Sequence, residues 1–179
     1  MPRWQEIVES APEFAAGVRR HLDGRVHKTI ATVRAGGAPR ISGIEAFFAE
    51  GDLWFGSMPN ARKALDLRRD PRFALHSGSV DPPEWEGDAK LAGQAQEITD
   101  ADRRLAVFRT RGADPPSGEA HLFRADIQEA VLVGLNEARD RRDRALAPGA
   151  GTAAHRAGVG RRLRPRRELA HVLRRRVSD

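Results

Sequence analysis

Hydrophobic positions in the first quarter of the chain change their spacing once. Between residues 4 and 22 apolar side chains recur every three or four positions, which predicts an amphipathic helix that Pro12 interrupts or restarts. Residues 29–34 and 40–48 then alternate on either side of Ala35-Gly36-Gly37-Ala38-Pro39. Alternation on both sides of a Gly-rich turn is typical of a β-hairpin. The chain is therefore predicted to begin with helix and to continue as sheet.

The next segments continue the strands and add two short helices. Residues 53–57 predict a third strand, and residues 61–69 predict a helix that Asn60 could cap. Further strands are predicted at residues 72–77, 88–98 and 122–133, and a second helix at residues 100–111. Six short strands in antiparallel-type succession favour a mainly β protein with short helices (α+β), arranged as a small closed or nearly closed barrel.

Composition narrows the class of protein. A chain of 179 residues with 40% hydrophobic residues can bury the core of one domain. No apolar run approaches the ~20 residues of a membrane span and no signal-peptide pattern opens the chain, so we expect a soluble, cytoplasmic protein with no membrane partner. The absence of cysteine excludes disulfides and thiolate metal sites, and no metal site is predicted from the six histidines. Any redox chemistry would need a bound organic cofactor.

Charge divides the chain unevenly. The net charge is +6, yet residues 135–179 hold thirteen arginines against five acidic residues and no aromatic residue. Such a composition buries too little apolar area to offset the entropy of ordering. We therefore expect a helical segment at residues 1–28, a barrel domain at residues 29–134, and an Arg/Ala/Gly-rich tail without stable structure at residues 135–179.

The stretch that follows the third strand is the best candidate for a binding site. Ser57 and Asn60 lie in the predicted turn, and Arg62 and Lys63 occupy the first turn of the predicted helix. Because free N–H groups at a helix start attract anions, this arrangement predicts a phosphate site without a P-loop. Lys63 is one of three lysines against 28 arginines. The alternative interpretation is that Arg62 and Lys63 form a solvated helix face.

Two further residues are weaker candidates. His76 ends a predicted strand and could be either a site residue or a hydrogen-bonded structural residue, and Trp85 lies in a Pro-rich loop that could pack its indole. No carboxylate pair, Ser-His-Asp spacing or Gly-rich nucleotide fingerprint is present, so no catalytic residue is predicted. If the protein is an enzyme, the chemistry belongs to a cofactor that the protein positions.

Residues 29–133 resemble the pyridoxamine 5'-phosphate oxidase-like split-barrel family, in its actinobacterial-type branch. The motif that carries the resemblance is the helix with Arg62-Lys63, then Leu67-Arg68-Arg69-Asp70-Pro71-Arg72 and the apolar strand at residues 73–76. The resemblance implies a six-stranded antiparallel split β-barrel of Greek-key type that binds FMN or the deazaflavin coenzyme F420. It implies that Arg62 and Lys63 contact the cofactor phosphate, with Ser57 and Asn60 as partners.

The resemblance also bears on activity and assembly. Residues 42–47 lack the second Arg and Lys of the vitamin B6 oxidase, which argues against pyridoxamine-phosphate oxidation. The function it implies is a flavin- or deazaflavin-dependent oxidoreductase that transfers hydride to or from a small-molecule substrate. The alternative is a non-catalytic flavin- or deazaflavin-binding carrier protein. A homodimer is expected, because family members place the cofactor between subunits and because Phe47, Phe48 and Trp54 supply much large apolar surface.

The basic tail suggests two further interpretations. The Arg runs at residues 160–167 and 173–176 could bind nucleic acid, although such runs are usually solvated tails. The family resemblance instead implies one more strand and a Trp-His-Pro-Gly-Arg-Gly motif. Residues 142–157 can be written in codons that, read one base later, encode Val-Thr-Glu-His-Trp-His-Pro-Gly-Arg-Gly. We therefore expect a tail derived from a frameshift, which leaves an open sheet edge beside residues 125–133.

Overall fold

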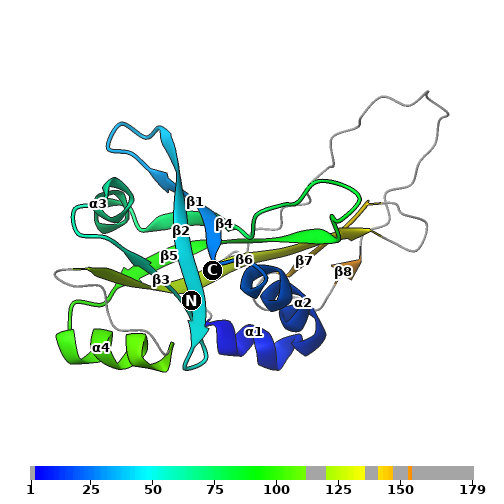
Figure 1. Cartoon of the computed structure of the whole chain (residues 1–179), viewed down its shortest axis with the longest axis horizontal. Coiled ribbons are helices and arrows are strands. Elements are labelled where there is room, and N and C mark those ends of the chain that lie inside the picture. Colours follow the sequence, from blue (N-terminus) through cyan, green and yellow to red (C-terminus); the bar gives the residue numbers. More distant parts are fainter. Residues whose placement is uncertain (1–2, 112–119, 136–140, 147–152, 155–179) are drawn as a thin grey trace.

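The computed structural model describes residues 3–111, 120–135, 141–146 and 153–154. Among them the helices are α1 (Trp4–Ser10), α2 (Pro12–Asp23), α3 (Arg62–Arg69) and α4 (Ala101–Thr110), and the strands are β1 (His27–Val33), β2 (Pro39–Ala49), β3 (Asp52–Ser57), β4 (Arg72–His76), β5 (Gly87–Glu97), β6 (His121–Leu135), β7 (Arg141–Leu146) and β8 (Ala153–Ala154) (Figure 1). None of these helices has the length and apolar character needed to cross a membrane.

The strands form one antiparallel sheet that closes on itself. Its order is β3-β2-β1-β4-β5-β6-β7-β8, and β3 also pairs with β6, so β1 to β6 form a closed barrel. Gly93 occupies an irregularity in the β5–β6 pairing, where a Cβ would lie 2.0 Å from the Asp126 carbonyl oxygen. Only glycine fits such a close backbone approach. The predicted six-stranded antiparallel split barrel with short helices is confirmed.

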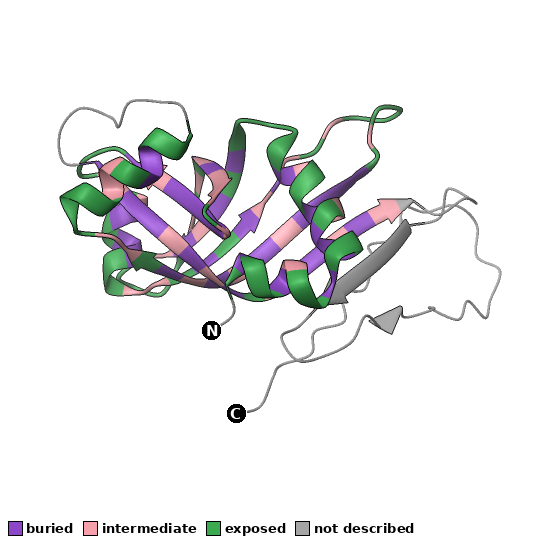
Figure 2. Ribbon diagram, turned by 90° about the horizontal axis from the view of Figure 1, so that it is seen from below, coloured by how far each residue is buried: buried purple, intermediate pink, exposed green. Residues whose placement is uncertain are grey.

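The barrel interior holds the main core, and α2 covers one part of it. Alternate strand residues point inward, which leaves Ile30, Leu75 and Leu91 almost without exposed surface. Pro12 occupies the first turn of α2, where a missing N–H costs nothing, and α2 buries Phe14 and residues on the same face (Figure 2). The hydrophobic spacing read from the sequence therefore corresponds to one buried helix face.

A second hydrophobic cluster lies between β3 and α4. Trp54 is 1% exposed and packs with Val107 and Phe108, while its Nε1 donates to the Ala49 carbonyl at 2.8 Å. Phe47 lies against Phe108, with ring centroids 6.4 Å apart. The expectation that these aromatic side chains need a second subunit to cover them is therefore wrong, because α4 of the same chain covers them.

Phe48 on β2 is covered from the other side. Its ring lies 4.7 Å, centroid to centroid, from that of Trp4 on α1. Arg3, just before α1, forms an ion pair with the buried carboxylate of Asp52, which fixes the start of the chain against β3. The N-terminal helices thus cover an apolar strand surface that the sequence had suggested for a partner subunit.

The start of the tail also differs from expectation. β7 pairs with β6 in the register from Ala130↔Leu146 to Leu135↔Arg141. The expected open edge beside residues 125–133 is therefore wrong for residues 130–133, because Arg141–Leu146 supplies backbone partners there. The remaining tail, including both Arg runs expected to bind nucleic acid, lies outside the described residues apart from Ala153–Ala154.

Candidate functional site

The connection from β3 to α3 places the start of α3 beside β2. Asn60 has a left-handed backbone with φ of 58°, and the Ala61 N–H donates to the Met58 carbonyl at 3.2 Å. The N-cap residue is Ala61, not Asn60 as expected, because Asn60 lies in the preceding turn, a conformation that Asn tolerates well. Ala61 has no side-chain acceptor, so the first amides of α3 lack a side-chain cap.

A carboxylate in the middle of α3 holds the helix against the barrel. The Asp66 side chain is 5% exposed and accepts hydrogen bonds from Thr32 Oγ1 at 3.0 Å and from Arg40 Nε at 2.6 Å. Arg69 Nη2 adds a third at 3.2 Å. Burial opposes ionisation of Asp66, but these three donors outweigh it and hold the pKa of the carboxyl below its usual value. The network connects α3 to β1 and β2.

Lys63 lies one turn earlier and has a different environment. Its Nζ donates to the Gly43 carbonyl on β2 at 2.5 Å, and burial lowers the pKa of the ammonium. No carboxylate pairs with Lys63 or with the exposed Arg62 among the described residues. An ammonium carries three donors, so Lys63 can donate to a further acceptor. Two cationic residues and uncapped helix amides thus lie at the start of α3, an arrangement suited to binding an anion.

Ser57 lies beneath this site, at the end of β3. The residue is 8% exposed, and its Oγ has no hydrogen-bond partner among the described residues. It pairs in register with His121 of β6, so both side chains lie on the same face of the sheet. Of the expected site residues, Asn60, Arg62 and Lys63 thus lie together at the start of α3, whereas Ser57 is buried below them.

His76 lies on the outer face of the barrel, in line with Gly43. The register joins Gly43 of β2 to Thr29 of β1, and Thr29 to His76 of β4. The His76 Nδ1 accepts the Gly78 N–H at 3.0 Å, so the neutral ring carries its proton on Nε2, 3.8 Å from Asp88 Oδ2. Burial lowers the pKa of His76 and favours this neutral ring. His76 can therefore donate one hydrogen bond from a fixed position.

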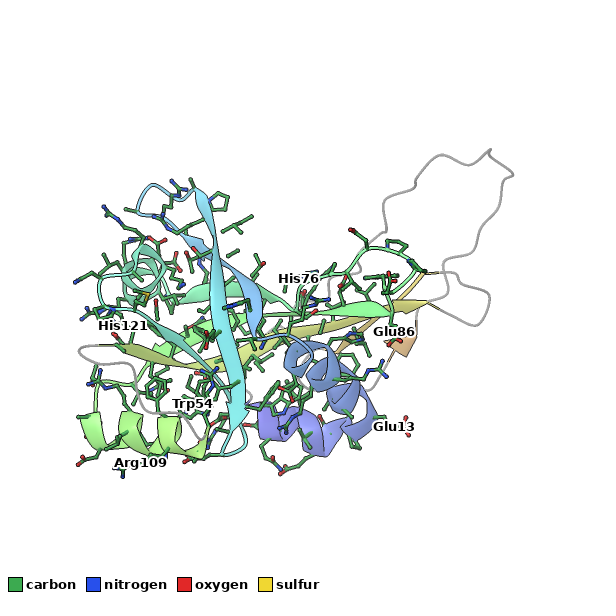
Figure 3. The ribbon with its side chains drawn as sticks, in the orientation of Figure 1. Glu13, Trp54, His76, Glu86, Arg109 and His121 are labelled. Atoms are coloured by element: carbon green, nitrogen blue, oxygen red, sulfur yellow. The ribbon has the colours of Figure 1, made fainter. Side chains whose placement is uncertain are left out.

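Trp85 does not join this group. It lies half-buried in the loop between β4 and β5, next to Glu86. Figure 3 shows Glu86 and His121 towards opposite ends of the long axis, and α3 lies at the end with His121 (Figure 1). The structure therefore separates Trp85 from the start of α3.

Sequence reasoning missed the residues that position α3. Arg40 and Thr32 come from two other strands, and the only local signal was the spacing of Asp66 and Arg69, which are three residues apart on one helix face. It also missed His121 and Glu97, whose side chains meet at 2.6 Å although they lie on different strands. No sequence spacing indicates such contacts, because strand register creates them.

Comparison with known proteins places this geometry in a family. The sequence profile described as "Pyridoxamine 5'-phosphate oxidase" matches residues 18–134. No curated protein sequence matches the chain.

Solved structures share the fold at low sequence identity. PhzG from Burkholderia lata 383, in complex with tetrahydrophenazine-1-carboxylic acid, has a TM-score of 0.60 at 12% identity, over 86% of this chain and 92% of that one. A putative pyridoxamine 5'-phosphate oxidase from Listeria innocua has a TM-score of 0.53 at 16% identity, over 65% of this chain and 95% of that one. A heme binding protein from Mycobacterium smegmatis has a TM-score of 0.55 at 18% identity, over 74% of this chain but only 57% of its own length. Because the profile covers more than half of the chain and the barrel agrees with it, the chain belongs to the pyridoxamine 5'-phosphate oxidase family.

Proposed function

We propose that the chain is a flavin- or deazaflavin-dependent oxidoreductase that holds the phosphate of FMN or coenzyme F420 at the start of α3. The observation that carries the proposal is the first turn of α3, whose backbone amides have no side-chain cap. Lys63 in this turn donates to the Gly43 carbonyl, and no carboxylate neutralises its charge among the described residues. A phosphate there would accept from the backbone amides and from the two cations.

The neighbouring surface fits a planar group. A Cβ built at Gly43 meets no atom within 4 Å, so the outer face of β2 is open at this point. Thr29, Ala31 and Ala74 continue the same outer face across β1 and β4 with small side chains. A strip of small residues beside a phosphate site supports binding of a flat ring system along the sheet.

The side chains have separate tasks under this proposal. Lys63 and Arg62 bind the phosphate, and the Nε2–H of His76 supplies a donor about two strand spacings, roughly 10 Å, from Gly43. When bound, the flavin or deazaflavin supplies the hydride chemistry. The protein contributes binding and orientation, and the substrate is a small molecule.

A non-catalytic carrier is the second candidate. It is favoured by the state of His76, whose ring is neutral and already accepts the Gly78 N–H on Nδ1, so it offers no free base beside the strip. Both candidates use the same binding residues. Turnover distinguishes them, because an oxidoreductase passes electrons onward from a reductant and a carrier does not.

A homodimer is part of the proposal. Ile41 on the outer face of β2 is 75% exposed and lies in register with Ala31, next to the strip. An exposed apolar residue beside a flat face suits contact with a second copy. Light scattering at tens of micromolar protein should give twice the chain mass, and a monomer at that concentration would contradict this part.

The central experiment measures cofactor binding directly. The purified protein is titrated with FMN and with F420 while the visible absorption spectrum is recorded. Lys63→Met should weaken binding by ~1–3 kcal/mol, because a charge-assisted hydrogen bond to phosphate is lost. Arg109→Met, an exposed change on α4, is the control and should bind as the wild type does.

A second variant tests the strip. Gly43→Val places a side chain in open space on the outer face, so the thermal unfolding midpoint should change little while cofactor affinity falls. Unchanged affinity of both Lys63→Met and Gly43→Val for FMN and F420 would contradict the proposed site.

A further inference from the structure

A pocket of about 250 Å³ lies beside α3 on a different helix face from the proposed phosphate site. Leu65 and Arg68 line it, and their spacing of three residues places them on one face of the helix. Lys63 is two residues before Leu65, which rotates it about 200° around the helix axis. Asn60 borders both the pocket and the start of α3, but neither Arg62 nor Lys63 lines the pocket.

One side of the pocket is a fixed polar cluster at the end of the barrel. Glu97 ends β5. His121, labelled in Figure 3, begins β6. Glu97 Oε1 contacts His121 Nδ1 at 2.6 Å, and Glu97 Oε2 forms an ion pair with Arg68 Nε at 3.1 Å. Because an ionised carboxylate only accepts hydrogen bonds, Nδ1 of His121 is the donor in this contact. Glu97 thus holds both neighbours in place.

The positive charges that line the pocket are not fully balanced by carboxylates. Arg104 of α4 also lines it and donates from Nη1 to the Ala120 carbonyl at 2.8 Å. No carboxylate pairs with Arg104 within the described parts of the chain. The lining therefore holds two guanidinium groups, Arg68 and Arg104, against one carboxylate, Glu97, which leaves one positive charge in excess among these three side chains. One anionic group would complete the balance.

Apolar side chains also line the pocket, beside the polar Asn60 and Thr99. Leu65 is 39% exposed although it is a large hydrophobic side chain, and Ile98, directly after β5, is half-buried. Burying such side chains against an apolar ligand is favourable. The pocket combines an unpaired guanidinium with an apolar wall, which is a pattern of small-molecule sites.

We infer that this pocket binds a small organic monoanion, a carboxylate carried on an apolar body. The carboxylate pairs with Arg104, since a guanidinium forms parallel hydrogen bonds to a carboxylate, and the apolar body contacts Leu65 and Ile98. A single negative charge matches the excess charge of the lining. The volume suits a ligand of the size of one aromatic ring with its carboxylate.

Benzoate is the probe, and benzyl alcohol is its neutral counterpart. Both are titrated into the isotope-labelled full chain while the NMR signals of the His121 ring and of Ile98 are followed. Benzoate should shift both signals to saturation with a Kd of about 1 mM or tighter, and benzyl alcohol should bind at least about tenfold more weakly.

Two variants locate the binding. Arg104→Gln should weaken benzoate binding by about tenfold or more, whereas Arg109→Gln on the same helix should leave it unchanged. Leu65→Trp changes a half-exposed side chain, fills the pocket and should abolish the shifts of His121 while the remaining spectrum stays folded. Equal benzoate binding by wild type and Arg104→Gln, no saturable shift at His121, or equal binding of benzyl alcohol would each overturn the inference. FMN is added separately, so failure of the proposed cofactor site leaves these results unaffected.

Discussion

The start and the middle of α3 differ in how fully their charged side chains are paired. Asp66 accepts from Thr32, Arg40 and Arg69, so its buried charge is matched on several sides. Lys63, three residues earlier, donates to the backbone carbonyl of Gly43 and has no carboxylate partner among the described residues. A charge with complete partners serves the fold, because a buried ion without partners is costly. A charge that retains unused donors at an open surface is available for a ligand.

The largest effect is expected at Asp66. Asp66→Asn removes the charge that compensates the partly buried Arg40, which should lower the free energy of unfolding by about 3–5 kcal/mol. Urea unfolding of the full chain measures this change. Asp70→Asn, which breaks the more exposed pair with Arg72 after the same helix, is the matched control and should have a much smaller effect. Equal losses in the two variants would remove the distinction drawn for α3.

The same residue predicts a pH dependence. The folded state holds the pKa of Asp66 below its usual value of 3.8, so ionised Asp66 stabilises the fold above that value. This stability is lost as pH falls through the folded pKa, because the unfolded state takes up the proton first, and below the folded pKa Asp66 is protonated in both states. Unfolding midpoints measured from pH 6 down to about pH 2 should fall less steeply in Asp66→Asn than in the wild type.

Lys28 is an intermediate case, a buried cation whose hydrogen bonds within the described part of the chain go to backbone carbonyls. Its Nζ bonds to Ala46 at 2.8 Å and to Val26 at 3.2 Å, and burial lowers its pKa. The folded state therefore releases its proton at lower pH than the unfolded state, so stability should rise as pH passes through the folded pKa towards 10.5. Chemical unfolding between pH 8 and 10.5 should show this rise, by about 1 kcal/mol or less, and Lys28→Met should lack it.

A smaller effect on stability is expected at Lys63. If its charge serves a ligand, Lys63→Met should change the free energy of unfolding without cofactor by no more than about 0.5 kcal/mol. The same urea series that includes Asp66→Asn provides the measurement. A loss as large as that of Asp66→Asn would make Lys63 a structural residue and remove the contrast between the two parts of α3.

The last prediction concerns the tail and needs no protein variant. If the tail comes from a frameshift, the nucleotides after the Arg141 codon encode Trp-His-Pro-Gly in the neighbouring frame. Sequencing the gene tests this directly. If that frame does not encode the motif, the pairing of Arg141–Leu146 with β6 is a native feature of this chain, and the tail needs a function of its own.

Much of the fold could be predicted from the sequence, because local patterns determine it. Alternation placed the strands, and the spacing after Pro12 placed α2. The helix predicted at residues 100–111 corresponds to α4, whose N-cap Asp100 accepts the Arg103 N–H at 2.7 Å. The pairing of Arg62 with Lys63 at a helix start was also local. The capping role assigned to Asn60 was wrong, because the turn uses its left-handed conformation instead.

Only the tertiary structure decided which surfaces and charges remain free. Trp54 looked like interface surface until α4, some fifty residues later, was found to cover it. Asp66 meets Thr32 and Arg40 across sequence separations of 34 and 26 residues, and Glu97 meets His121 across 24. Strand register and barrel closure set these contacts, and a one-residue change of register would turn each strand side chain to the other face. The sequence by itself therefore determined the elements and their likeness to a family, whereas closure of the barrel decided which charges are paired and where a ligand can bind.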